Sequence, residues 1–134
     1  MDQLDQRLLE LLRQNSRTSN TQIARKLGIT EGAVRNRIKK LVQTGVIKRF
    51  TVELAQEANI EAIVLIRTQA NQTKQVALQA KKISQNVFET SGEYDVAVHI
   101  YAKNVDELNQ LVDKIRALEG VTNTTTLIKL VSDP

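Results

Sequence analysis

The sequence predicts an α+β fold made of two small domains, and three features of its 134 residues carry that prediction. The first fifty residues show the apolar spacing of helices three times in succession. The residues after position 60 alternate β-branched, strand-like runs with helical spacing. The net charge is positive in the first stretch and negative in the second. A lone unit under about 60 residues is only marginally stable. We therefore expect the two units to be stabilised by packing against each other or against other subunits.

The first half of the predicted fold is helical. The stretch "DQLDQRLLELLRQN" carries leucines at helical spacing, with Asp2 favourably placed near the helix N-terminus. The stretch "SNTQIARKLG" opens with Ser19 and Gln22, a capping-box pair, and stops at Gly28. Thr30 can cap a third helix by accepting hydrogen bonds from backbone N–H groups. We therefore expect three helices in this half.

The stretch "GVIKRFTVEL", which follows a helix stop at Gly45, changes the pattern from helical to period-two. Its β-branched residues predict a short strand or ribbon near residues 46–52. Three helices plus a short β-ribbon make residues 1–50 a winged helix-turn-helix domain. The polar segment "AQEAN" is then interpreted as part of a linker at 51–59.

The second domain is predicted at residues 60–134, where strand and helix signals alternate. The order β-α-β-β-α-β is the ferredoxin-like arrangement, in which helices cover one face of an antiparallel sheet. The opposite face would need a second sheet, because apolar residues lie on both sides of the strand around His99, so we infer a homodimer. The predicted strands lie at 60–69, 86–91, 94–102 and 121–131, and the predicted helices at 73–84 and 104–120.

The charge is divided unequally between these domains. Residues 1–50 hold 11 Lys and Arg against 4 Asp and Glu, a net charge of +7. The remaining residues hold 8 against 11, which makes that part of the chain net negative by 3. The positive charge of the first half would attract nucleic-acid phosphates, which is typical of a nucleic-acid-binding domain. The negative charge of the second half would not attract phosphates.

Composition excludes several classes of protein. Hydrophobic content of 41% and charged content of 25% are typical of a folded chain. The absence of an apolar run near the roughly 20 residues of a membrane span, and of a signal peptide, predicts a cytoplasmic protein without a membrane partner. The chain has no cysteine and a single histidine, His99, which we interpret as a packed or interfacial residue. We therefore expect no metal, no cofactor and no enzymatic activity.

The third predicted helix has the two sides that a DNA-reading helix needs. Val34, Ile38 and Leu41 share one face and would anchor the helix against the other two helices. The opposite side carries donors that can reach base edges or phosphates in the major groove. Arg37 lies nearer the buried edge. The candidate DNA-binding residues are Thr30, Gly32, Arg35, Asn36, Arg37, Lys39, Lys40, Lys48 and Arg49.

The chain resembles the Lrp/AsnC family of transcription regulators, also called feast/famine regulators, along nearly its whole length. Four motifs in the right order carry the resemblance: "MDQLDQRLLELLRQNSR", "IARKLGIT", "VRNRIKKLVQTGVIKRF" and "SGEYDVAV". The resemblance implies a sequence-specific regulator of double-stranded DNA. It also implies a second domain that dimerises, assembles further, commonly to octamers, and senses a free amino acid.

The resemblance also implies an effector site. The "GEYD" turn and a C-terminal Thr-x-Thr match the family's motifs. Backbone N–H groups of a glycine turn can bind an α-carboxylate, a carboxylate can bind the α-ammonium, and threonine hydroxyls can add hydrogen bonds. The candidate effector residues are Gly92, Glu93, Tyr94, Asp95, Thr124 and Thr126.

Two other functions remain open at this point. The chain could be an architectural, chromatin-like protein that wraps DNA with little sequence preference. It could also be a metabolic enzyme or a subunit that regulates one. No phosphate-binding glycine loop, paired catalytic carboxylates or nucleophile-base set supports the enzyme. Which amino acid is sensed, which genes are bound and whether they are activated or repressed do not follow from the sequence.

Overall fold

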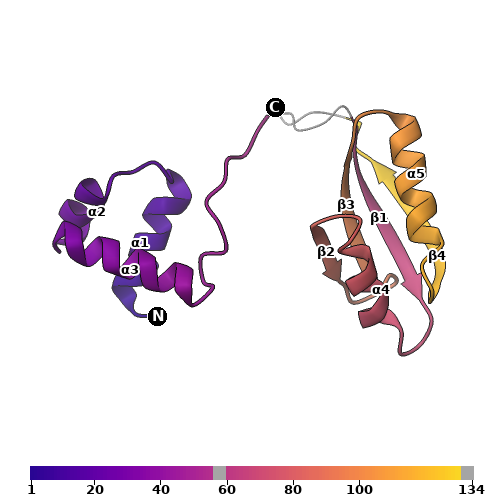
Figure 1. The fold of residues 1–134 in the computed structure, drawn as a ribbon, viewed down its shortest axis with the longest axis horizontal. Coiled ribbons are helices and arrows are strands. Elements are labelled where there is room, and N and C mark those ends of the chain that lie inside the picture. The colour runs from indigo at the N-terminus through magenta and orange to yellow at the C-terminus, as the bar shows by residue number, and fades with distance from the viewer. Residues whose placement is uncertain (56–59, 131–134) are drawn as a thin grey trace. The chain divides into compact units, whose positions relative to one another are not determined.

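A computed structural model describes residues 1–55 and 60–130. The chain divides into two compact units, Met1–Glu53 and Leu54–Pro134 (Figure 1). Parts of the predicted linker, at 56–59, and of the predicted second domain, at 131–134, lie outside the described residues.

Three helices form the first unit, and each begins at a side-chain cap. Asp2 accepts from the backbone N–H of Asp5 at 2.8 Å in a capping box. Ser19 accepts from Gln22 at 3.1 Å in a second capping box, as predicted. Thr30 accepts from the backbone N–H of the residue three positions on, at 3.1 Å. The helices are α1 (Gln3–Gln14), α2 (Asn20–Leu27) and α3 (Glu31–Gln43).

The core of the first unit is small and apolar. The predicted anchors of α3, Val34 and Leu41, are buried, and Ile38 is half-buried against the same cluster. Gly28 ends α2 with a φ of 71°, a left-handed backbone that lets the chain turn sharply into α3. The turn fixes the angle between α2 and α3. The cluster contains Leu8, Ile23, Ala24, Leu27, Val34 and Leu41.

The predicted strand at 46–52 is not formed. The described residues after α3 run in irregular conformation, and Val46, Phe50 and Val52 are exposed there. A ribbon needs two strands that exchange hydrogen bonds, and no second strand pairs with this segment in the described part of the unit. The prediction of a short strand or ribbon at 46–52 from the period-two pattern was therefore wrong.

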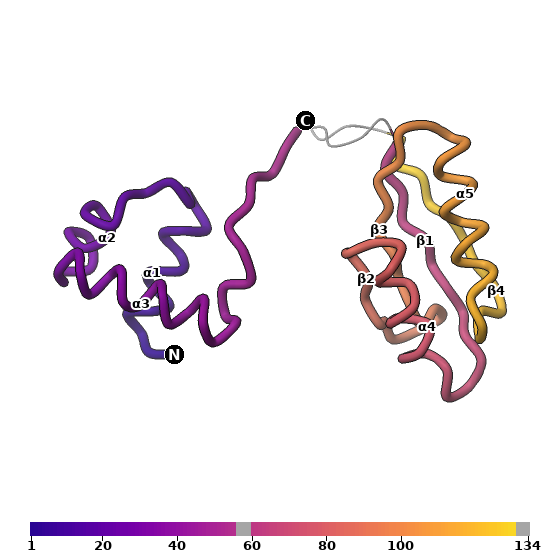
Figure 2. The backbone as a smooth tube through the Cα atoms, in the orientation of Figure 1, coloured from indigo at the N-terminus to yellow at the C-terminus, as the bar shows by residue number. Residues whose placement is uncertain are grey.

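The second unit has the predicted β-α-β-β-α-β order (Figure 2). Its four strands form one antiparallel sheet in the order β2-β3-β1-β4. The described elements are β1 (Ile60–Thr68), α4 (Thr73–Ala80), β2 (Asn86–Glu89), β3 (Val96–Ala102), α5 (Val105–Arg116) and β4 (Val121–Ile128). Several are shorter than predicted; α4 ends at Ala80 because turns replace the helix at 81–83.

Helices α4 and α5 cover one face of the sheet. The inward residues of the two central strands, among them Val64, Ile66 and Val98, are fully buried. They pack against apolar residues of the helices, including Val76 and Ile115. Asn104 caps α5 by accepting from the backbone N–H of the residue three positions on, at 2.8 Å. The two helices thus bury the apolar side chains of only one face of the sheet.

The other face of the sheet is open and carries large apolar side chains. Phe88, Ile63 and Leu127 are 58%, 41% and 52% exposed on it. His99 also lies on this face, where its Nε2 is 2.8 Å from Glu61. Although burial raises the pKa of Glu61, hydrogen bonds from His99 and from a lysine hold that pKa below its ordinary value. This face therefore combines exposed apolar side chains with polar ones, among them the pair of His99 and Glu61.

Candidate DNA-recognition helix and effector turn

The outward side of α3 is polar and solvent-facing. Arg35, Asn36, Lys39 and Lys40 are all exposed, while the anchors of the same helix point inward. Gly32 lies in the first turn, and a Cβ built on it would meet no heavy atom within 4 Å. This side has the donors and the unobstructed backbone that approach to a groove requires. Thr30, also exposed, is occupied as the helix cap.

Both arginines of α3 already have partners within the chain. Arg35 donates to Glu31 one helical turn earlier, and this pairing raises its pKa. Arg37 is directed towards α1, where its Nη1 lies 2.7 Å from a carboxylate oxygen of Asp2 and 3.0 Å from Asp5. The hydrogen bond from Arg37 is the main reason that the pKa of Asp2 lies below its ordinary value. The structure therefore separates Arg37 from the solvent-facing cations.

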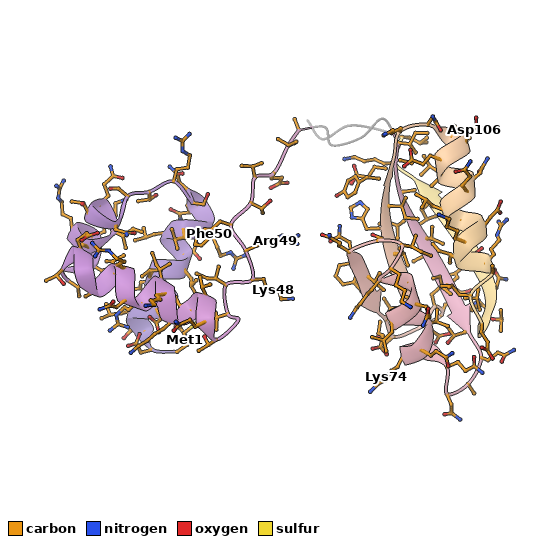
Figure 3. The ribbon with its side chains drawn as sticks, in the orientation of Figure 1. Met1, Lys48, Arg49, Phe50, Lys74 and Asp106 are labelled. Carbon is orange, nitrogen blue, oxygen red and sulfur yellow. The ribbon has the colours of Figure 1, made fainter. Side chains whose placement is uncertain are left out.

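Lys48 and Arg49 lie in the irregular segment after α3. Both are exposed, and Figure 3 shows their side chains pointing away from the helices of the unit. Neither forms an ion pair with an acidic group among residues 1–55 and 60–130. They remain available for an anionic partner.

The predicted effector turn joins β2 to β3. Thr90 closes it by donating its backbone N–H to the carbonyl of Asp95 at 2.9 Å and its hydroxyl to the carbonyl of Tyr94 at 2.8 Å. Gly92, with a φ of 105°, takes the left-handed conformation at the exposed tip. The glycine therefore shapes a tight loop whose backbone faces solvent.

The carboxylate of Asp95 is held by the end of the neighbouring strand. It accepts from the backbone N–H of Thr68 at 2.8 Å and from the hydroxyl of Thr68 at 3.2 Å. The backbone N–H of Asp95 in turn donates to the carbonyl of Ile66 at 2.9 Å. Asp95 therefore fastens the turn to β1 in addition to any contact with a ligand.

Charges of both signs meet beside this turn. Arg67 pairs with Glu93, and its guanidinium lies 5.3 Å from the ring centre of Tyr94. The Tyr94 hydroxyl lies 3.1 Å from the hydroxyl of Thr125. The turn, β1 and β4 thus contribute a cation, an anion and hydroxyl groups to one corner of the sheet.

Thr124 and Thr126 share one strand face, as predicted, but they do not join this group. They pair in register with Ile66 and Val64, which face the helices. Thr124 accepts from Arg116 of α5 at 3.2 Å instead. The structure brings Gly92, Glu93, Tyr94 and Asp95 together and leaves the two threonines on the helix-covered side.

Three residues of this corner were missed in the sequence analysis: Arg67, Thr68 and Thr125. The cation at the end of a strongly apolar strand was a usable signal for Arg67. Period-two alternation places Thr125 on the opposite strand face from Thr124 and Thr126, but it does not show which of the two faces lies beside the turn. Thr68 had no distinguishing pattern.

Other chemistry has little support in the described part of the chain. Residues 1–55 and 60–130 contain no group of three side chains that could hold a metal ion. None of the helices there is long and apolar enough to cross a membrane.

Two protein families match the two units. Residues 1–48 match the winged helix-turn-helix DNA-binding family, and residues 61–132 match the Lrp/AsnC ligand binding domain. The HTH-type transcriptional regulator LysM of Sulfurisphaera tokodaii is 41% identical over 133 residues, 97% of this chain and 95% of that protein.

Solved structures share the fold. MtbAldR superposes with a TM-score of 0.86 at 21% identity, covering 100% of this chain and 97% of the other. The complex of the transcriptional regulator NMB0573 from Neisseria meningitidis with L-Met has a TM-score of 0.78 at 18% identity, covering 98% and 90%. The order of the units, the matched domains and the relative at 41% identity lead to one conclusion. The chain belongs to the Lrp/AsnC family, as a DNA-binding transcriptional regulator with a ligand-binding domain and not an enzyme.

Proposed function

We propose that the protein is a sequence-specific transcriptional regulator whose activity or assembly responds to a small free amino acid. The observation that carries the DNA-binding part is the division of α3 into a buried apolar side and an exposed side with Arg35, Asn36, Lys39 and Lys40. An amide such as Asn36 suits an adenine edge, whereas lysines suit phosphates. Thr30 and Gly32 at the N-terminal end of α3, and the cations Lys48 and Arg49 after it, are further candidate contacts in this proposal.

The phosphate contacts are tested by replacing Lys39 and Lys40 with alanine in the full chain. Each phosphate contact contributes about −0.9 to the slope of log affinity against log salt, so the double variant should bind more weakly with a slope shallower by up to about 2. The matched control is Lys81→Ala plus Lys82→Ala, two adjacent exposed lysines of the other unit. Fluorescence anisotropy with duplex DNA at several salt concentrations measures both. An unchanged slope in the α3 variant would contradict the proposed face.

Sequence preference distinguishes a regulator from the architectural alternative. A dimer would present two recognition helices to half-sites one helical turn, about 10 bp, apart. Footprinting on DNA from the region upstream of the gene that encodes the protein should therefore show a discrete protected site in the presence of random competitor DNA. Protection without any preferred site would favour DNA wrapping.

The effector part of the proposal rests on the corner beside the 90–95 turn. A free amino acid carries a carboxylate and an ammonium group, and this corner presents Arg67 for the first and Glu93 and Asp95 for the second. The related fold of NMB0573 was solved with L-Met, an amino acid, bound to that protein. A ligand here acts on DNA binding only if it binds two states of the protein unequally.

The effector is tested by thermal shift against the twenty amino acids, followed by Asp95→Asn. A ligand at a hundred times its Kd stabilises the folded state by about 2.7 kcal/mol, which raises the melting temperature. Asparagine can still accept the hydrogen bond from Thr68 but has no charge for an ammonium group. The rise in melting temperature caused by the ligand should therefore be smaller in Asp95→Asn and unchanged in the control Asp106→Asn. A full shift in Asp95→Asn would remove Asp95 from the ligand site.

We further propose that the protein works in the cytoplasm as a homodimer formed through the open sheet face, and that dimers assemble to an octamer. The exposed Ile63, Phe88 and Leu127 support the dimer, because apolar patches on one side of a sheet usually mark an interface. The octamer rests on family membership alone.

A further inference from the structure

One cation of α3 faces the neighbouring helix α1 instead of the solvent. A single nitrogen of Arg37, Nη1, lies 2.8 and 2.7 Å from the two carboxylate oxygens of Asp2 and 3.0 Å from Asp5. The side chains of Arg37 and Asp5 are 29% and 16% exposed, whereas that of Asp2 is 57% exposed, so solvent screens the contact with Asp5 less than the contact with Asp2. Three charged groups that lie far apart in sequence thus meet at one point.

The same two carboxylates also form the N-terminal cap of α1. Asp2 accepts from the backbone N–H of Asp5 at 2.8 Å, and the Asp2 backbone N–H points back to the Asp5 side chain at 3.4 Å. Arg37 therefore joins the start of α1 to the middle of α3. Without the guanidinium, two negative charges would stand uncompensated beside the helix that approaches DNA phosphates.

We propose that Arg37 is a positioning residue for DNA binding, which neutralises Asp2 and Asp5 and holds α3 in place without itself contacting DNA. The inference rests on the DNA-binding face proposed above. It assigns Arg37 a different role from Lys39 and Lys40, although all three are cations of one helix. In this role Arg37 contacts no phosphate, so its effect on affinity should depend on the presence of the two carboxylates.

A double-mutant cycle separates this role from direct contact. Arg37→Gln is made in the native chain and in a chain carrying Asp2→Asn plus Asp5→Asn. Asparagine caps a helix about as well as aspartate, so the paired variant removes the charges while leaving the cap. Affinity for a mixed-sequence duplex is measured by anisotropy across about 50 to 200 mM salt.

Arg37→Gln is expected to weaken binding about three- to tenfold in the native chain at low salt. The loss should become smaller as the salt concentration rises, because salt screens the repulsion between the uncompensated carboxylates and the DNA phosphates. The loss should disappear in the chain that lacks both carboxylates. The same loss in both chains would identify Arg37 as a direct DNA contact and overturn the inference. No loss in the native chain would also overturn it.

Arg37→Lys keeps the inference testable if the glutamine variant unfolds. Because only one nitrogen of Arg37 is used, a lysine ammonium can take its place, and affinity should stay within about twofold of the native chain. A loss as large as that of glutamine would show that charge compensation is not the role. Lys39→Ala plus Lys40→Ala, measured alongside, reports independently on the proposed face.

Discussion

Gly32 occupies the first turn of α3 on the exposed side, where a Cβ would meet nothing within 4 Å. Gly32→Ala should therefore raise the free energy of unfolding by about 0.5 to 1 kcal/mol, because alanine loses less backbone freedom on folding. The added methyl group would keep the helix backbone away from a groove wall, so DNA affinity should fall. Denaturant unfolding and anisotropy measure the two effects. A more stable variant with unchanged affinity would mean that this backbone does not approach DNA closely.

At the scale of residues, the solvent-facing side of α3 could be predicted because helical geometry alone assigns sides. The partners of Arg37 could not, since Asp2 lies 35 positions away in the sequence. The bond between Asp95 and Thr68 spans 27 positions and was hidden for the same reason. For Thr124 and Thr126, alternation predicted a shared face correctly, but only the pairing with β1 determines which face it is.

At the scale of elements, α2 depends on its cap because it has only eight residues. Ser19→Ala removes the acceptor for the backbone N–H of Gln22 and should lower the free energy of unfolding by about 1 kcal/mol. Ser16→Ala, an exposed serine in the loop before α2, is the control. Urea unfolding followed by circular dichroism compares them. Equal stability of the two variants would show that the cap contributes nothing to the folded unit.

Caps and stops were the most predictable parts of the elements, since each depends on residues three or four positions apart. Ser19 and Thr30 both cap as predicted. The strand expected at 46–52 failed because a strand depends on a partner, and local pattern cannot supply one. The lengths of β2 and β3 were overestimated for a similar reason. β2 ends before the 90–95 turn and β3 begins after it, where Thr90 donates its backbone N–H to the carbonyl of Asp95.

At the scale of the whole molecule, the open sheet face makes the proposed dimer testable. Ile63→Asp places a charge in the middle of that face and should shift the protein towards monomers, because burying an unpaired charge is costly. Leu78→Asp is the control, since Leu78 of α4 is 62% exposed but lies outside the sheet. Sedimentation velocity over a range of concentrations reports the mass. Native mass in Ile63→Asp would place the interface elsewhere.

The two-part organisation could be predicted because charge and periodicity both change along the chain. The identity of the effector could not, because side-chain specificity depends on pocket walls that no local pattern describes. The corner around Arg67 and Tyr94 could not be predicted either, because its residues come from β1, the 90–95 turn and β4, which meet only in the folded sheet.

The exposed side of α3 also bears on how such a protein can diverge. Arg35, Asn36, Lys39 and Lys40 lie outside the apolar cluster that holds the three helices together. In the proposed DNA-binding mode, replacing them would alter which base edges and phosphates are met while the apolar cluster stays intact. Operator preference would then change by exchange of a few surface side chains, without a compensating change in the core that supports them.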